Sequence, residues 1–320
     1  MSAGSVVVTS RSFGTRDPSL PRELEAASLE VVRADPRHDP AQLAELLPGA
    51  VAWIAGTGPV TDELLALAPR LRVLARYGVG YDAVDVAAAT RRGIWVTITP
   101  GANGEAVADL TMVLVLDVLR HVSAGAAAVA RGDWTVHCGR ELGALTVGLV
   151  GFGRVGQAVA RRMLGFGASV LAVDPVLESS PVPGVELVDD RALASRCDVL
   201  SLHAPGGQVL LDRERLSRLR PGVTVVNTAR ADLVDEPALA EALRSGHVAA
   251  YACDTLSSEQ GGTSPLQAAD LADRVLVTPH LGGQTEEAVA RMGRMAADNV
   301  LAVLRGEAPP HPVNQPEEVR

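Results

Sequence analysis

Residues with acid–base or anion-binding chemistry stand directly behind apolar runs in the C-terminal part of the sequence. Arg230, Asp254 and His280 each follow such a run closely, and Glu259 lies five residues after Asp254 in a polar stretch. Short valine-rich runs are typical of buried strands, and open α/β sheets bind ligands beyond the carboxyl ends of their strands. We therefore expect these side chains on neighbouring loops at one sheet edge. The three runs are 223–227, 249–252 and 275–278.

These side chains have the functional groups that oxidation of a 2-hydroxy acid requires. The planar guanidinium of Arg230 can hold a carboxylate and polarise the reacting oxygen. His280 can take the hydroxyl proton as hydride leaves the carbon, because an unperturbed imidazole titrates near neutral pH. Glu259, placed against the second ring nitrogen, would set the tautomer and stabilise the imidazolium. Taken singly, each residue has a plainer interpretation: a salt-bridged surface arginine, a structural histidine or a solvated loop carboxylate.

A glycine-rich turn earlier in the chain predicts a binding site for the cofactor of such a reaction. An apolar run at 145–150 leads into Gly151, Gly153 and Gly156, in the pattern G-x-G-x-x-G, and a helix-forming segment comes next. The first glycine permits a tight turn, the second lets the backbone approach a pyrophosphate, and the third lets helix pack on strand. Asp174 ends the next apolar run, 18 positions after Gly156 (174 − 156), close to the roughly 20 expected for the carboxylate that binds the ribose of NAD. The sequence therefore predicts an NAD site at this turn.

Length, charge and cysteine content limit the classes of protein that fit. The 320 residues suffice for two domains, and a net charge of −9 with a pI near 5.3 argues against binding nucleic acid or an acidic membrane surface. Cys138, Cys197 and Cys253 are too scattered for a disulfide framework or a zinc site, and Cys253 is interpreted as a buried strand residue rather than a nucleophile. Without a signal-peptide pattern or an apolar run of membrane-spanning length, we expect a cytoplasmic protein with no metal.

Strand-like and helix-like segments alternate along the chain, which predicts parallel sheets in two α/β domains. The first domain is expected to comprise 1–100 plus 285–320, because the long final helix at 285–305 should pack back on the first hundred residues. The second is expected at 101–284, after the break at Pro100 and Gly101. Expected strands of the first domain are 5–9, 29–32, 50–55, 71–76 and 94–97, and those of the second include 145–150, 168–173, 199–202 and the three runs named above.

Five ordered motifs run through nearly the whole chain. They are ARYGVGYDAVD at 75–85, TPGANGEAVAD at 99–109, GFGRVG at 151–156, NTARADLVDE at 227–236 and TPHLGGQTEEA at 278–288. Through these motifs the chain resembles the D-isomer-specific 2-hydroxyacid dehydrogenase family, most closely its phosphoglycerate dehydrogenase-type members without a regulatory domain. The resemblance implies a Rossmann NAD-binding domain inserted in a smaller flavodoxin-like substrate domain. It also implies NAD-dependent hydride transfer at C2 of a D-2-hydroxy acid or its 2-keto acid.

The same resemblance assigns roles to individual residues, with Arg230, Glu259 and His280 as the catalytic set. Asp254 would face the nicotinamide carboxamide, and the backbone of residues 78–80 would cradle the substrate carboxylate. The residues expected at the cofactor are Gly151, Gly153, Arg154, Val155, Gly156, Asp174, Ala204, Pro205, Thr228, Ala229, Arg230, Asp254, His280, Gly282 and Gly283. Those expected at the substrate are Arg76, Gly78, Val79, Gly80, Asn103, Arg230 and His280.

The chain departs from the family pattern at some positions. The loop of Glu259 lacks the usual aromatic residue and the proline after the acid, so its assignment depends on its spacing from Asp254. Ala231 replaces the glycine common after the catalytic arginine. Arg76 is placed to meet an anionic tail, such as the phosphate of 3-phosphoglycerate, but the second arginine of phosphoglycerate-specific members is absent from residues 55–58. Whether the substrate has an anionic tail therefore stays open.

Two further expectations concern partners. The resemblance implies a homodimer formed through the NAD-binding domain, and residues 134–142 are placed to contribute to its interface. A function of another class also fits the same fold, namely an NAD(H)-sensing corepressor that binds a partner protein. Such family members have long extensions, and the chain shows no obvious tail or extra domain, which favours an enzyme.

Overall fold

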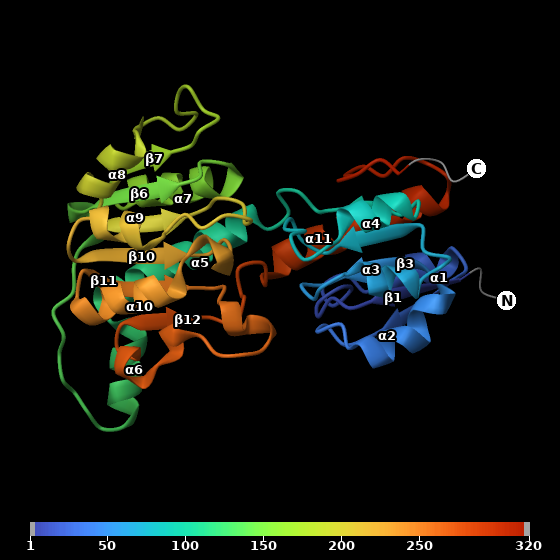
Figure 1. The fold of residues 1–320 in the computed structure, drawn as a ribbon, viewed down its shortest axis with the longest axis horizontal. Helices are drawn as coiled ribbons and strands as arrows, with labels where there is room; N and C mark the ends of the chain where they lie inside the picture. Colours follow the sequence, from blue (N-terminus) through green and yellow to red (C-terminus); the bar gives the residue numbers. More distant parts are fainter. Residues whose placement is uncertain (1–3, 317–320) are drawn as a thin grey trace. The chain divides into compact units, whose positions relative to one another are not determined.

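The computed structural model describes residues 4–316, and the chain folds into two compact units. The first unit comprises Met1–Asn103 and Gly283–Arg320, and the second comprises Gly104–Gly282. The chain therefore leaves the first unit once and returns to it once, with the second unit inserted between (Figure 1).

The first unit is built on a five-stranded parallel sheet with the order β2-β1-β3-β4-β5. This is the flavodoxin-like order, whose point of reversal lies between β1 and β3. The strands are β1 (Gly4–Val8), β2 (Leu29–Arg33), β3 (Ala50–Ala55), β4 (Val73–Arg76) and β5 (Trp95–Thr97). The helices are α1 (Ser19–Ala26), α2 (Pro40–Leu46), α3 (Asp62–Ala66), α4 (Val86–Arg91) and α11 (Glu286–Leu304).

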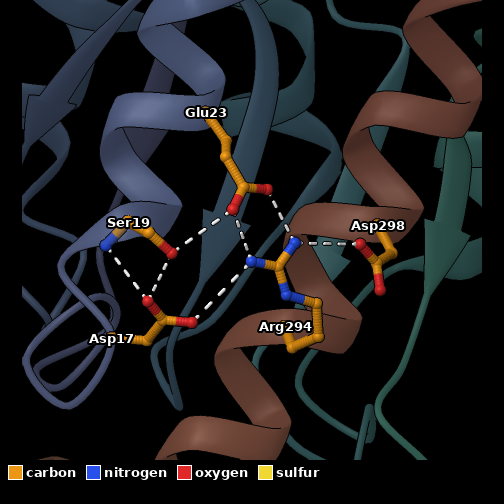
Figure 2. Close-up of polar contacts among 5 residues, drawn as sticks. All are labelled: Asp17, Ser19, Glu23, Arg294 and Asp298. Carbon is orange, nitrogen blue, oxygen red and sulfur yellow. Dashed lines mark hydrogen bonds and ion pairs between the residues drawn. The ribbon is translucent and has the colours of Figure 1, made fainter.

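The C-terminal segment completes this first unit. Helix α11 contacts β4, β5 and α1, and residues beyond it add an antiparallel bridge between Thr97 and Pro312 at the edge of the sheet. Figure 2 shows how α1 and α11 are joined, with Arg294 donating to both oxygens of Glu23 at 2.7 Å. The N-terminal and C-terminal parts of the chain therefore form one folded unit.

The second unit is built on a seven-stranded parallel sheet with the order β12-β11-β10-β9-β6-β7-β8. The order reverses between β6 and β9, as in the doubly wound Rossmann fold. The strands are β6 (Thr146–Val150), β7 (Ser169–Val173), β8 (Val185–Leu187), β9 (Val199–Leu202), β10 (Val223–Asn227), β11 (Val248–Cys253) and β12 (Val275–Val277). The helices are α5 (Gly104–Arg120), α6 (Val122–Ala130), α7 (Arg154–Gly165), α8 (Asp190–Arg196), α9 (Arg213–Arg218) and α10 (Glu236–Ser245).

The fold class expected from the sequence is confirmed, but the sequence prediction named neither β8 nor the helices α1, α4, α6, α8, α9 and α10. Helix α5 ends at Arg120 because His121 adopts a left-handed φ of +55°, and α6 then continues at an angle of 64° to α5. Every residue of α6 is at least partly exposed. Among residues 4–316 no single helix is long and apolar enough to span a membrane, although the bent pair α5 and α6 together meets that length and composition.

Candidate active site

The turn after β6 has the backbone geometry of an anion-binding loop. Gly151 has a φ of +90°, and a Cβ there would lie 2.7 Å from the carbonyl group of His203, so no side chain fits. A Cβ at Gly156 would lie 2.4 Å from the carbonyl oxygen of Gly151, so α7 packs directly on the loop. A Cβ at Gly153 would meet no atom within 4 Å, and Gly153 caps α7 without a side-chain acceptor. This leaves space for an anion at the positive end of the helix.

Asp174 lies directly after β7, and its side chain accepts a hydrogen bond from the glycine loop. Its Oδ2 accepts from the Phe152 amide at 2.7 Å, and its Oδ1 accepts from the Val176 amide at 3.0 Å. A carboxylate oxygen can accept more than one hydrogen bond, so the side chain keeps capacity for ribose hydroxyls. Loop and carboxylate follow adjacent strands, beside the reversal of strand order where such sheets bind dinucleotides. These residues fit the diphosphate and ribose of NAD.

Three adjacent strands of the same sheet present two predicted catalytic residues, Arg230 and His280, and the predicted cofactor residue Asp254. Arg230 follows β10, Asp254 follows β11 and His280 follows β12, and these strands pair in parallel. Their carboxyl ends therefore point to one edge of the sheet, the edge that also has the glycine loop. The structure thus brings residues far apart in the sequence onto consecutive loops, as the apolar runs predicted.

His280 and Glu259 form a direct pair across 21 residues of sequence. The Nδ1 atom of His280 lies 2.8 Å from Oε1 and 3.0 Å from Oε2 of Glu259, and the two side chains are 35% and 37% exposed. With Nδ1–H donated to the carboxylate, Nε2 is the ring nitrogen that can exchange a proton with a ligand. His280 also has a left-handed φ of +56°, which is uncommon for this residue type.

Asp254 holds the backbone that carries His280. Its side chain is 2% exposed; Oδ1 accepts from the Thr278 hydroxyl at 2.5 Å and the Leu281 amide at 2.7 Å, and Oδ2 accepts from the Gly282 amide at 2.7 Å. A Cβ at Gly282 would lie 3.1 Å from that Oδ2, so glycine lets the loop approach closely. The sequence prediction gave Asp254 a cofactor contact only, and the positioning of the His280 loop was missed.

The turn that carries Arg230 is held by a buried asparagine that the sequence prediction also missed. Asn227 is 0% exposed; its Nδ2 donates to the Arg230 carbonyl at 2.7 Å, and its Oδ1 accepts from the Ala229 amide at 3.0 Å. The Arg230 guanidinium donates to the Ala229 carbonyl at 2.7 Å. Ala231 begins a 3₁₀ turn and has no positive φ, so this position does not require the glycine usual in the family.

The other cofactor residues predicted within the second unit lie at the same edge of the sheet. Arg154 and Val155 open α7, and Ala204 and Pro205 follow β9. The Thr228 hydroxyl lies after β10, 2.8 Å from the hydroxyl of Thr111 on α5. Their contacts with a bound cofactor stay predictions, as does that of Gly283, the first residue of the returning chain.

Of the substrate-binding residues predicted in the first unit, Arg76 ends strand β4 and residues 78–80 follow it. The Arg76 guanidinium donates to the Tyr77 carbonyl at 2.5 Å and lies beside Gly78, where a Cβ would approach it to 3.0 Å. Gly78 has a φ of +145°, and its carbonyl accepts from the Thr99 amide at 2.9 Å. Asn103 lies within this unit near Gly283.

Residues 112–282 match the family model described as "D-isomer specific 2-hydroxyacid dehydrogenase, NAD binding domain". This range covers the glycine loop, Asp174 and the three strand-end loops. The chain belongs to the D-isomer-specific 2-hydroxyacid dehydrogenase family, and NAD is the cofactor of the matched domain.

Curated relatives include two kinds of named enzyme. A D-3-phosphoglycerate dehydrogenase of Mycobacterium leprae is 40% identical over 284 residues, which are 86% of this chain and 53% of that protein. A glyoxylate reductase of Thermofilum pendens is 36% identical over 271 residues, which are 81% of this chain and 79% of that protein. The chain therefore spans about half the length of the phosphoglycerate dehydrogenases that it matches.

A solved structure with bound ligands has the same fold. The D-lactate dehydrogenase of Aquifex aeolicus, complexed with NAD and lactic acid, superposes with a TM-score of 0.86 and 26% sequence identity. The match covers 98% of this chain and all of that one. These three relatives are named as dehydrogenases or reductases, so the alternative of an NAD(H)-sensing corepressor gains no support from them.

Proposed function

We propose that the protein is an NAD-dependent D-2-hydroxyacid dehydrogenase, which interconverts a D-2-hydroxy acid and its 2-keto acid. The observation that carries this proposal is the His280–Glu259 pair at 2.8 Å, on the sheet edge that also carries Arg230 and the glycine loop. A proton-transfer group, a cation for a carboxylate and a dinucleotide site are the parts that this reaction requires.

Each of the three catalytic residues has its own part in the proposed reaction. Nε2 of His280 takes the proton of the substrate hydroxyl during oxidation and returns it to the carbonyl oxygen during reduction. Glu259 stabilises the imidazolium formed in the first case and holds the ring in the tautomer that presents Nε2. Arg230 binds the carboxylate beside the reacting carbon and polarises the oxygen.

The glycine loop and the start of α7 hold the diphosphate of NAD, and Asp174 binds the adenosine ribose. When bound there, NAD would supply the hydride acceptor for oxidation of the hydroxy acid and, in its reduced form, the hydride donor for reduction of the keto acid. The Asp174 carboxylate repels the 2′-phosphate of NADP, and Pro175 beside it brings no cation. We therefore expect a strong preference for NADH over NADPH.

The substrate itself is proposed only as a class. The relatives act, by name, on phosphoglycerate and on glyoxylate, and the side chains that distinguish these acids are expected in the first unit. Arg76 is the residue there whose charge suits an anionic tail. The backbone of Gly78, Val79 and Gly80, with Asn103, is proposed to bind the carboxylate that all these acids share.

Assembly as a homodimer is proposed from the apolar side chains that the second unit exposes. Trp134 is 77% exposed and Val136 is 91% exposed, and both follow α6, whose valines Val122 and Val129 are also exposed. Apolar side chains gathered on one segment favour a protein–protein contact.

A cytoplasmic location stays a prediction from the sequence.

The proposed function is tested by following NADH oxidation over a panel of 2-keto acids. Glyoxylate, pyruvate, hydroxypyruvate and phosphohydroxypyruvate differ in tail while keeping the same reacting end, and NADPH serves as the cofactor control. The proposal expects turnover of at least one keto acid with NADH and much weaker turnover with NADPH. Stoichiometric NADH binding with no turnover of any keto acid would contradict it.

A further inference from the structure

A buried carboxylate outside the predicted catalytic set holds the loop that carries Glu259. Glu236, the first residue of α10, is only 6% exposed. Its Oε1 accepts from the Ser257 amide at 2.9 Å, and its Oε2 accepts from the Ser257 hydroxyl at 2.6 Å and the Ser264 hydroxyl at 2.5 Å. One side chain therefore ties together both ends of the loop 257–264.

Glu259 lies between these two tied ends. Ser257 begins a 3₁₀ turn that ends at Gln260, and the Glu259 amide donates to the Leu256 carbonyl at 3.0 Å. Past the turn, Gly261 and Gly262 have positive φ values of +111° and +96°, and a Cβ on either would meet no atom within 4 Å. Gly261 and Gly262 therefore add no side-chain packing to the loop. The Glu236 carboxylate binds the loop at its start and its end, and the Ser258 hydroxyl donates to Gln267 at 2.8 Å across it.

The carboxylate of Glu236 is not used to cap its own helix. The N-cap of α10 is Asp235, whose side chain accepts from the Ala238 amide at 3.0 Å. The donors to Glu236 are an amide and two hydroxyls, all uncharged, and burying a carboxylate is unfavourable unless such donors satisfy it. All three of these hydrogen bonds go to one loop, which points to a role of the Glu236 carboxylate in that loop.

We propose that Glu236 is a positioning residue for proton transfer, which acts by holding Glu259 against Nδ1 of His280. The proposal rests on the function proposed above, because it gives Glu236 a part in the same reaction. When Glu236 is replaced by glutamine, the negative charge is removed and the amide NH₂ leaves the serine hydroxyls only an acceptor role toward it, so the hydrogen bonds that hold the loop become weaker. Glu259 then spends less time at His280, and the imidazolium loses stabilisation.

The first test measures His280 directly and does not need turnover. In ¹³C-labelled protein with NADH bound, the His280 ring signal is assigned by its absence in His280→Ala, and its titration midpoint is followed by NMR. The titration midpoint of His280 should be lower in Glu236→Gln than in the wild-type protein. Glu259→Gln should lower it in the same direction and by more. Glu241→Gln is the matched control, because Glu241 lies on the same helix in an exposed pair with Arg213, and it should leave the midpoint unchanged. A Glu236→Gln midpoint equal to the control value would overturn the proposal.

The second test separates positioning from general stabilisation. Glu236→Gln should lower kcat for keto-acid reduction about 10-fold, as expected for a lost hydrogen bond to a charged group, with the dissociation constant of NADH unchanged. In a Glu259→Gln background it should lower kcat no further, because the residue through which it acts is already altered. An equal loss in both backgrounds would make Glu236 a merely structural residue.

Two outcomes distinguish this inference from the proposed function. If wild-type protein reduces no keto acid but the His280 midpoint still shifts in Glu236→Gln, the proposed function fails and the positioning role stands. If keto acids are reduced but the midpoint does not shift, the positioning role fails alone. Should Glu236→Gln not fold, Ser264→Ala removes a single donor to the same carboxylate and should shift the midpoint in the same direction.

Discussion

At the scale of the residue, His280 is the side chain whose loss should separate chemistry from binding. His280→Ala removes the group that exchanges the proton and leaves the glycine loop and Asp174 in place. We expect kcat to fall by ~10²–10⁴-fold, the usual contribution of general acid–base catalysis, with the dissociation constant of NADH nearly unchanged. Steady-state kinetics and NADH fluorescence titration measure the two quantities, and a large loss of NADH affinity would assign His280 to the cofactor site instead.

The cysteines give a second prediction at this scale. Burial raises the pKa of both Cys197 and Cys253 to about 12, so at pH 8 only ~10⁻⁴ of each is the reactive thiolate. We expect iodoacetamide to label neither residue in the folded protein and both in denaturant, as read by peptide mass mapping. Rapid native labelling of Cys253 would revive the thiol nucleophile that its place beside Asp254 suggested.

The residues that could be predicted from the sequence are those that local patterns identify. Arg230 and His280 stand directly behind apolar strands, and the glycine loop has its own spacing. Among the residue patterns, only the spacing of Glu259 from Asp254 pointed to Glu259. The roles of Asn227 and Glu236 could not be predicted. The hydrogen bonds of Asn227 depend on the path of the backbone through a turn, and those of Glu236 depend on a loop that lies far from it in the sequence.

At the scale of the element, the junction of α1 and α11 includes one arginine among carboxylates. Arg294 pairs with Glu23, and Ser19 donates to Asp17 in the same group (Figure 2). The Arg294 guanidinium holds the pKa of Glu23 below its ordinary value of 4.5, and the Ser19 hydroxyl, with Arg294, holds the pKa of Asp17 below 3.8. Both groups are therefore more acidic in the folded state than in the unfolded state.

The sign of the resulting pH dependence follows from these directions. A depressed folded-state pKa stabilises the fold fully above the unfolded value, and the contribution is lost as pH falls through the folded value. Arg294→Ala should therefore lower Tm slightly at pH 7, and the difference from wild type should shrink below about pH 4. Arg305→Ala, an exposed arginine at the end of the same helix, is the control. A Tm difference that is constant from pH 7 to pH 3 would exclude this electrostatic origin.

Strands and helices could be predicted from the sequence where their apolar residues form a strong pattern. The valine-rich strands and the long final helix at 285–305 were recognised because burial on one or both faces leaves a clear pattern. Helix α6 was missed because its residues, mostly alanine and valine, show no polar face and none is buried. Strand β8 and helix α1 were missed because each is short and offers few apolar positions to count.

At the scale of the whole molecule, the chain divides the proposed reaction between two folded units. The second unit has the NAD loop and the residues proposed for proton transfer, and the first has the loop proposed to read the substrate. Both units are built from parallel sheets, which place loops at the carboxyl edges of their strands. Chemistry and substrate selection can therefore change independently, which agrees with relatives named for different acids.

This division predicts opposite patterns for two arginine variants tested on the same keto-acid panel. Arg76→Ala should raise KM about 10-fold or more for a phosphate-tailed acid and little for glyoxylate or pyruvate, because a charge-assisted contact worth roughly 1.5–3 kcal/mol is lost only where the tail exists. Arg230→Ala should lower kcat/KM for every acid alike, because all of them share the carboxylate end. Steady-state kinetics of both variants, with melting curves as the folding control, decide the matter. A uniform effect of Arg76→Ala would mean that Arg76 only supports its own loop through the Tyr77 carbonyl, and an acid with an uncharged tail would then be the better substrate.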